Sequence, residues 1–435
     1  MEEVRTDTLE HENGTVLCND PDGHGEDLSC VNENLTEEEE ALDVPHITIN
    51  RKRLRTFLDL ASKIPNRSKD HCKFVMFEAD MIEVDGKEQP VLYMSASDND
   101  QVSTIRMEVP VLNSSNVFMD SYLVLKHSTL SNAERLIDGD NFTLRVISRG
   151  MQNNHAVYDV SALIYGGWIS IPQGAFTPVS FTFQMGSTES ELAVSPSDVY
   201  DALRYLVKVA ATQHKEQYSS VLFQEDCAFV EDLGGYVRYD GHFFTHRVPL
   251  WTSDIIQRLI STCQPKTIKV STVRDKVSGY PHTRYEGDGF DLTFTRFGKA
   301  FLSSPVPSMS EGVRVDISTL RNIAHIPLVF KTDLQGYFDG SITLEFKREN
   351  GTEQFTARLG GKSSAEDCHR LSYEVFGDLR NYCKAKLPAQ LMYQFLDSCR
   401  DTGMVSLHFD LQGHTVSMRL GKWTCQLDVD ESEDK

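Results

Sequence analysis

The sequence predicts an α+β fold built from three copies of one structural unit, with an acidic extension at the N-terminus. The length of 435 residues exceeds what one hydrophobic core usually organises. At about 100–150 residues per domain it suggests three folded units. A pattern of one strand followed directly by one helix occurs three times, and the acidic residues are concentrated at the two ends.

The strand–helix pattern begins at residues 46, 191 and 313. Each copy starts with a short alternating run, as in His46-Ile-Thr-Ile-Asn, and continues into residues with apolar side chains at helical spacing. In the first copy these are Leu54, Phe57, Leu58 and Ala61, which place one apolar stripe on one helical face. We therefore expect one buried helix face in every copy.

Hairpin signals follow each of these helices. They are Asp85-Gly86 in the first copy, Gly234-Gly235 in the second, and Asp339-Gly340 and Asn350-Gly351 in the third. A second helix then opens near a residue typical of helix starts, at Ser131, Thr252 and Pro388. Further strands are expected from residues 142, 267 and 405. The predicted unit is one strand, a helix, several strands, a second helix and several strands.

The terminal segments differ from this body. Residues 1–44 contain fifteen Asp/Glu and one Arg, and are expected to be disordered because they have too little apolar surface to offset the entropy of ordering. Residues 428–435 contain five acids and one Lys, so most of the formal net charge of −21 lies outside the body. The predicted boundaries are 1–44 acidic extension, 45–188 first domain, 189–307 second domain, 308–427 third domain and 428–435 acidic tail.

Several functional classes are disfavoured by the sequence. Nine cysteines without a CxxC pair indicate reduced, packed thiols, and the acidic N-terminus does not resemble a signal peptide, so a cytosolic location is expected. No P-loop, GxSxG, HExxH or dinucleotide-binding motif occurs. Asp98-Asn99-Asp100 lacks the Gly and Glu of a calcium loop and is interpreted as a turn between strands. We expect no catalytic residue, no metal and no cofactor.

The second copy carries the residues that resemble a known family. They are Ala202-Leu-Arg-Tyr-Leu-Val-Lys-Val-Ala, then Tyr218-Ser-Ser-Val-Leu-Phe, then Gly235-Tyr-Val-Arg-Tyr-Asp-Gly-His-Phe-Phe. This order resembles the bacterial sliding clamp, the β subunit of DNA polymerase III, with Asp240-Gly241-His242 matching its motif. Tyr239 stands where the family usually has Thr, and Phe243-Phe244 replace Arg-Leu. The resemblance covers about residues 46–427 and indicates a divergent member from a bacterium or phage.

The resemblance implies that two helices per domain line a ring around duplex DNA, with the sheets outside. Such helices need cations that contact phosphates without reading bases. Seven basic residues lie within residues 51–69, although any one of them could simply be a solvated position on a helix face. The candidate DNA-binding residues are Arg51, Lys52, Arg53, Arg55, Lys63, Arg67, Lys69, Arg204, Lys208, Lys215 and Arg321.

A second expected site is a hydrophobic pocket that captures short peptides of a DNA polymerase, a clamp loader and other factors. Aromatic anchors on a rigid rim suit this task. Similarity maps the pocket to Tyr218, Tyr239, Gly241, His242, Phe243, Phe244, Pro305, Trp423 and Leu427. The alternative is a turn glycine at Gly241 beside a core His and two buried Phe side chains. No second ligand accompanies His242 at a spacing that suits a metal.

The family also implies a head-to-tail homodimer that closes the ring. The resemblance places this contact near Tyr158 and Val160 of one chain and Ile326 and Leu328 of the other. The leading interpretation is therefore a sliding clamp that acts as a processivity factor and not as an enzyme. The alternatives are a clamp-fold interaction protein, such as a viral transcription coupler or a decoy of clamp-binding peptides, and an unrecognised nuclease or hydrolase.

Overall fold

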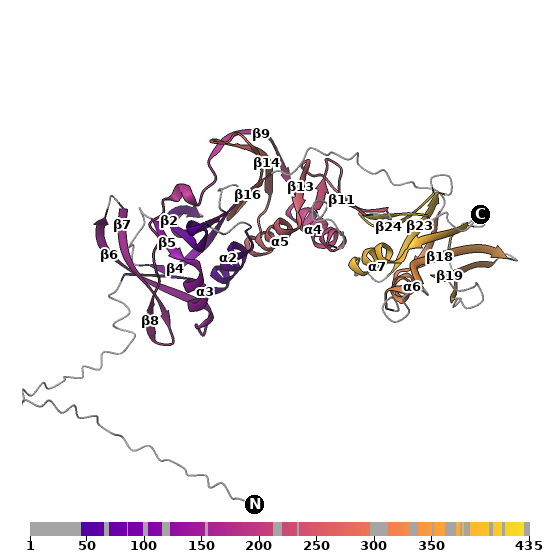
Figure 1. Ribbon diagram of the computed structural model, residues 1–435, viewed down its shortest axis with the longest axis horizontal. Helices are drawn as coiled ribbons and strands as arrows, with labels where there is room; N and C mark the ends of the chain where they lie inside the picture. Colours follow the sequence, from indigo (N-terminus) through magenta and orange to yellow (C-terminus); the bar gives the residue numbers. More distant parts are fainter. Residues whose placement is uncertain are drawn as a thin grey trace, which may run out of the picture. The chain divides into compact units, whose positions relative to one another are not determined.

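The computed structural model describes residues 45–429, apart from several internal segments. The segments left out are 65–68, 85, 99–102, 115–121, 153–154, 212–219, 233–234, 296–311, 330–337, 350–351, 362–370, 375, 378–382, 400–402 and 411–413. Figure 1 shows the described helices and strands in the order of the sequence. The predicted disorder of residues 1–44 and the tail from residue 430 lie outside the described residues.

The order strand, helix, four strands, helix, three strands is found first between residues 46 and 170. Asn50 caps α2 because its side chain accepts a hydrogen bond from the backbone N–H of Arg53. A short 3-10 turn (Asp70–Lys73) leads from α2 to the next strand. The elements are β1 (His46–Asn50), α2 (Arg51–Lys63), β2 (Phe74–Val84), β3 (Lys87–Ser97), β4 (Thr104–Ser114), β5 (Tyr122–Lys126), α3 (His127–Arg135), β6 (Asn141–Gln152), β7 (His155–Ile164) and β8 (Gly167–Ser170).

The same order occurs again between residues 185 and 295. The Ser195 side chain caps the first helix of this set by accepting from the N–H of Asp198, and Pro196 occupies the first turn, where a missing N–H costs nothing. The elements are β9 (Met185–Val194), α4 (Pro196–Ala210), β10 (Ser220–Phe223), β11 (Cys227–Asp232), β12 (Gly235–Asp240), β13 (His246–Pro249), α5 (Leu250–Cys263), β14 (Ile268–Asp275), β15 (Pro281–Gly287) and β16 (Phe290–Thr295).

The third occurrence lies between residues 312 and 428 and contains one additional two-residue strand. Its elements are β17 (Gly312–Asp316), α6 (Ile317–Val329), β18 (Phe338–Glu349), β19 (Thr352–Gly361), β20 (Leu371–Glu374), β21 (Phe376–Gly377), β22 (Cys383–Pro388), α7 (Ala389–Ser398), β23 (Met404–Asp410), β24 (Thr415–Leu420) and β25 (Trp423–Asp428). We refer to the three occurrences as the first, second and third element sets.

Neighbouring element sets are joined by antiparallel strand pairs. β4 of the first set pairs with β16, the last strand of the second set, with Thr104 opposite Thr293. β12 of the second set pairs in the same way with β25, the last strand of the third set, with Tyr239 opposite Trp423. Both junctions therefore use the third strand after the first helix of one set and the final strand of the next.

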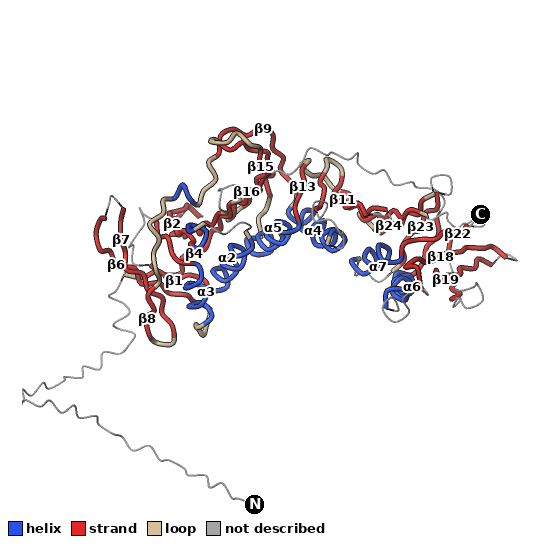
Figure 2. Tube along the Cα trace, in the orientation of Figure 1, coloured by secondary structure: helices blue, strands red, loops and turns tan. Residues whose placement is uncertain are grey.

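The helices form a second layer over these sheets. α3 contacts α2, α2 contacts α5, α5 contacts α4, α4 contacts α7, and α7 contacts α6, so the described helices form one unbroken row. Figure 2 shows α3, α2, α5 and α4 in a row along one side of the strands. Each helix buries an apolar stripe, such as Leu54, Phe57 and Leu58 in α2, against the sheets. The prediction of one buried face per helix is confirmed.

Local boundaries differ from the predictions in three places. α3 begins at His127 and not at Ser131, because packing of Leu130 and Ala133 defines it and its start has no side-chain cap. Asp339-Gly340 is not a hairpin turn; it lies inside β18, where the register shifts and Gly340 takes a positive φ of 79°. β9 begins at Met185, four residues before the predicted boundary at 189.

Candidate functional site

The helical row carries an excess of positive charge in a chain that is strongly acidic overall. α2 to α7 together contain ten Lys/Arg and six Asp/Glu, whereas the whole chain contains 43 and 64. α2 alone contains five basic residues and one acid. The helices α3 to α7 together contain five basic and five acidic residues, so α2 supplies the excess. A basic helix in a strongly acidic chain is the electrostatic signature expected of a surface that faces a polyanion.

Two of the predicted basic residues are fixed by a buried acid on the neighbouring helix. Arg51 Nε donates to Glu134 Oε1 of α3 at 2.8 Å, and Arg55 Nε lies 3.2 Å from the same oxygen. The Glu134 side chain is only 4% exposed. Because a buried carboxylate without its cations is costly, this pairing holds α2 to α3 and keeps both arginines engaged.

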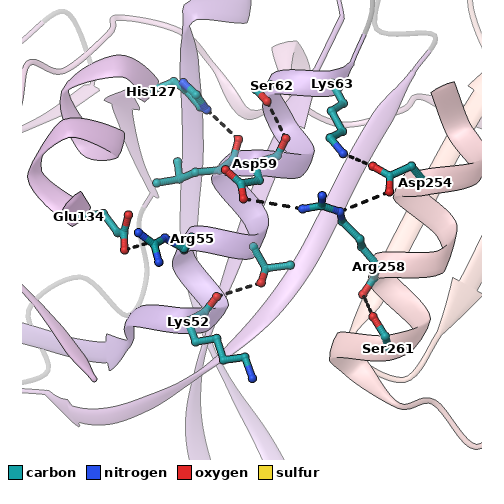
Figure 3. A network of polar contacts seen from close by, with 12 residues as sticks. Lys52, Arg55, Asp59, Ser62, Lys63, His127, Glu134, Asp254, Arg258 and Ser261 are labelled. Carbon is teal, nitrogen blue, oxygen red and sulfur yellow. Dashed lines mark hydrogen bonds and ion pairs between the residues drawn. The ribbon is translucent and has the colours of Figure 1, made fainter. Parts of the chain in front are cut away.

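A second group of charges connects α2 to α5, as Figure 3 shows. Lys63 of α2 is paired with Asp254 of α5. Arg258 of α5 lies 3.7 Å from Asp59 of α2 and 3.4 Å from Asp254. We call these four residues the α2–α5 ion square. Unlike Glu134, its members are between 34% and 56% exposed.

Four other predicted cations form no ion pairs within the part of the chain that the structure describes. Lys52, Arg204, Lys208 and Arg321 form no ion pair with another described residue, and Lys52 and Lys208 are exposed. Arg204 lies over the ring of Tyr205 at 5.4 Å. These four lie on α2, α4 and α6, the first helix of each element set.

Four further predicted cations either have other surroundings or lie outside the described residues. Arg53 donates to the Cys263 sulfur at 3.5 Å, which adds a second link between α2 and α5. Lys69 is exposed just before the 3-10 turn. Arg67 and Lys215 lie outside the described residues.

The predicted peptide pocket falls on an aromatic cluster at the junction of β12 and β25. The Tyr239 ring lies 4.6 Å from the ring of Trp423, and Trp423 meets Tyr205 of α4 edge to face at 5.0 Å. The Tyr239 hydroxyl donates to Asp198 Oδ1 at 2.9 Å, and Lys422 Nζ reaches the same oxygen at 2.7 Å. Burial and the Asp198 carboxylate raise the pKa of Tyr239 well above its usual value.

The turn after β12 completes this cluster. Gly241 lies against Phe243, whose ring a Cβ at position 241 would meet at 2.7 Å, so glycine is needed for this approach. Phe243 is buried, Phe244 is partly exposed and His242 is exposed. The His242 ring Nδ1 lies 3.2 Å from the Glu225 carbonyl oxygen, so it is anchored to the backbone of a neighbouring turn.

The structure brings together only part of the predicted pocket. Tyr239, Gly241, Phe243 and Trp423 are adjacent, whereas Leu427 is fully buried four residues along β25, opposite Gly235. At about 3.3 Å per residue this separates Leu427 from Trp423 by roughly 13 Å along the strand. Tyr218 and Pro305 lie outside the described residues. The sequence prediction did not include Tyr205, which helical spacing alone cannot connect to a strand more than two hundred residues away.

The residues predicted for self-association lie on two elements. Tyr158 and Val160 are in β7 and are 9% and 2% exposed, within the hydrophobic core of the first element set. Ile326 and Leu328 lie near the end of α6 and are partly exposed.

Neither metal-binding nor membrane-spanning features occur in the part of the chain that the structure describes. No group of three or more His, Cys, Asp or Glu side chains there could hold a metal ion. None of the helices in that part is both long enough and apolar enough to cross a membrane.

Comparison with known proteins identifies the fold. No protein-family model and no curated protein sequence matches the chain. The structure, however, is similar to the β subunit of DNA polymerase III from Thermotoga maritima, with a TM-score of 0.62, 12% identity, and coverage of 89% of this chain and 99% of that one. It is also similar to the β subunit from Streptococcus pyogenes, with a TM-score of 0.65, 10% identity, and coverage of 89% and 100%.

A third similar structure was determined with a bound peptide. It is the Helicobacter pylori β clamp bound to a DNA ligase peptide, with a TM-score of 0.62, 10% identity, and coverage of 88% of this chain and 99% of that one. The chain therefore has a sliding-clamp fold over nearly the whole length of these structures, which confirms the predicted type of fold; closure into a ring by two chains stays a prediction. The low identity agrees with the divergence indicated by Tyr239 and Phe243-Phe244.

Proposed function

We propose that this chain is a DNA sliding clamp that surrounds duplex DNA and tethers a polymerase and other factors to it as a non-enzymatic processivity factor. The observation that carries the proposal is the unbroken row of six helices with ten basic and six acidic residues, in a chain of net charge −21. Nothing in a clamp needs to read bases, so cations spaced along helices are sufficient. We assign the three element sets to the predicted domains 45–188, 189–307 and 308–427, with the second domain extended back to Met185, where β9 begins, and the third extended to Asp428.

Closure around DNA would come from head-to-tail pairing of two chains. β4 and β12 each pair with the last strand of the following element set, β16 and β25. In the third set the strand in the same position is β20, and the last strand of the first set is β8; each is the outermost strand of its described sheet. An open strand edge favours pairing with another chain. Pairing of β20 with β8 of a second copy repeats the internal junctions and joins the first and third domains.

Partner binding is assigned to the aromatic cluster at the β12–β25 junction. Trp423 is partly exposed beside the rigid, hydrogen-bonded Tyr239, and Phe244 is partly exposed after the turn that follows β12, which suits an apolar anchor of a short peptide. The similar Helicobacter pylori clamp was determined with a DNA ligase peptide. We therefore infer that polymerase and clamp-loader peptides bind here, in the cytosol of a bacterial or phage-infected cell.

The experiment that tests the proposal is charge reversal on α4. Arg204→Glu with Lys208→Glu removes two cations that form no ion pair with a described residue. Each lost phosphate contact lowers the slope of log affinity against log salt by about 0.9, so the double variant should lose up to about 1.8. Binding is measured by fluorescence anisotropy on labelled duplex DNA across a salt series.

The matched control is Lys269→Glu, a reversal on β14, away from the helical row. It should leave DNA affinity nearly unchanged. Retention on primed circular DNA, and loss on linearising it, separates a clamp from a clamp-fold protein that only captures peptides. Equal losses in the α4 double variant and the Lys269 variant, or no salt-dependent DNA binding by the native chain, would contradict the proposal.

A further inference from the structure

The α2–α5 ion square has a regular arrangement of charge. On α2 an acid, Asp59, precedes a base, Lys63, by four residues, and on α5 Asp254 precedes Arg258 by the same spacing. Each base contacts the acid of the opposite helix, and Arg258 also contacts Asp254 of its own helix (Figure 3). The square therefore joins the first and second element sets while adding no net charge to the row.

The square places two carboxylates on the exposed side of the helical row, one of them on the strongly basic helix α2. Asp59 is the only acid among the thirteen residues of α2, and Asp254 is the only acid of α5. Both lie on the exposed faces of their helices, at 56% and 46% side-chain exposure, while the opposite faces pack against the sheets. Phosphates that approach the row would meet these two carboxylates directly.

The square differs from the other ion pairs of the row in being open to competition. Exposed pairs contribute at most about 1 kcal/mol, since water and salt screen them. Glu134, at 4% exposure, holds Arg51 and Arg55 in a buried pairing that DNA cannot replace without exposing a desolvated acid. Lys63 and Arg258 are 34% and 42% exposed and can exchange one anionic partner for another.

We propose that Asp59 and Asp254 act as built-in competitors of DNA phosphate, which hold Lys63 and Arg258 and thereby lower the affinity of the helical row for DNA. This inference rests on the proposed DNA-binding function of the row, and it identifies two residues that regulate the strength of that binding. A clamp must be held near DNA but must also move along it, and contacts that can switch between an internal carboxylate and a phosphate serve both needs. DNA binding and the α2–α5 contact are then coupled, because a phosphate that binds Lys63 or Arg258 displaces the carboxylate of the opposite helix.

The test is the double variant Asp59→Asn with Asp254→Asn in the full chain. It frees two cations, so affinity for labelled duplex DNA at low salt should rise roughly tenfold, in line with the attraction between unit charges a few ångströms apart in water. The slope of log affinity against log salt should steepen by up to about 1.8. Each single variant should give an intermediate change.

The matched control is Glu189→Gln with Glu191→Gln on β9. These acids pair with Arg274 and Lys269 and are 36% and 52% exposed, so the control changes net charge by the same amount and also opens two exposed pairs. A gain in the helix variant that exceeds the gain in this control supports the inference. Equal gains, or none, overturn it even where the native chain binds DNA, whereas a native chain that does not bind DNA at all overturns the proposed function.

Discussion

Gly235, the first residue of β12, is predicted to control the junction between the second and third element sets. It has a φ of 140°, and a Cβ built there would lie 2.0 Å from the Gln426 carbonyl oxygen of β25. No side chain can be placed at that distance, so Gly235→Ala must push the two backbones apart. The substitution should act on the end of the β12–β25 strand pair at which Gly235 lies opposite Leu427.

The expected magnitude has two parts. An alanine held at such a φ costs about 1–3 kcal/mol wherever it occurs. Separation of the strands adds the loss of about two ladder hydrogen bonds, at about 1 kcal/mol each. Gly403 provides the control for the first part, since its φ is 151° and nothing lies within 4 Å of its Cβ position. Both variants share the backbone strain, and only Gly235→Ala adds the loss of ladder hydrogen bonds. The local destabilisation around residue 235 should therefore exceed the local destabilisation around residue 403 in Gly403→Ala by about 2 kcal/mol.

Hydrogen exchange is the suitable assay, because a chain with three element sets is not expected to unfold in one step. At about 1.4 kcal/mol per tenfold change, the loss of ladder hydrogen bonds alone should make amides of β25 around Leu427 exchange roughly thirtyfold faster in Gly235→Ala than in the native chain, and the backbone strain at residue 235 should increase this factor further. Amides of β4 and β16, at the other junction, should keep their native rates. Two results would refute the close approach of Gly235 to β25. One is that amides of β25 exchange in Gly235→Ala at their native rates, and the other is that Gly403→Ala speeds the exchange of these amides as much as Gly235→Ala does.

Two further predictions concern pH and self-association. Burial lowers the pKa of His282, whose Nδ1 donates to the Tyr280 carbonyl, so the folded state resists the proton that the unfolded state accepts. The stability of the fold should therefore fall as the pH drops below the ordinary histidine pKa. In a series of thermal denaturations at different pH, His282→Gln should show a weaker fall than the native chain, and an identical slope in both proteins would contradict this. If the chain forms the proposed head-to-tail dimer, Leu328→Glu on α6 should convert it to monomers in sedimentation, whereas Val277→Glu on the exposed β14–β15 loop should not. A dimer in both variants would remove α6 from the interface.

The sequence was most informative where local chemistry decides the structure. Alternation up to Asn50 and helical spacing after it predicted β1 and α2, because both patterns are local. The Asn50 cap was not predicted, although it too depends on local residues. Asn350-Gly351 lies outside the described residues, but the strands on either side of it, β18 and β19, pair with Glu349 opposite Thr352. Asp339-Gly340 carries the same turn signal but forms an irregularity inside β18, since a glycine with positive φ suits a bulge as well as a turn.

The candidate sites depended more on contacts between distant segments. Counting basic residues identified the charged helix α2, but it could not show that Glu134 holds two of its arginines or that Asp254 holds Lys63, because these partners lie 79 to 191 positions away. Trp423 was expected near Tyr239 from the family resemblance, whereas the packing of Tyr205 on it required the fold. The charge composition of a helix predicts a basic surface. Only the fold shows which of its basic side chains are already held in ion pairs and which are free to bind a phosphate.

Available cations occur in all three element sets. Lys52, Arg135, Arg204, Lys208 and Arg321 form no ion pair with another described residue. The helices of each set also carry carboxylates, which are Asp59 and Glu134 in the first set, Asp198, Asp201 and Asp254 in the second, and Asp397 in the third. Because every element set thus combines cations with carboxylates, no single stretch of the row would bind a phosphate strongly. Contacts that are weak individually and spread over three sets are lost and regained one at a time, which permits movement along a uniform polyanion while the sum of the contacts resists release.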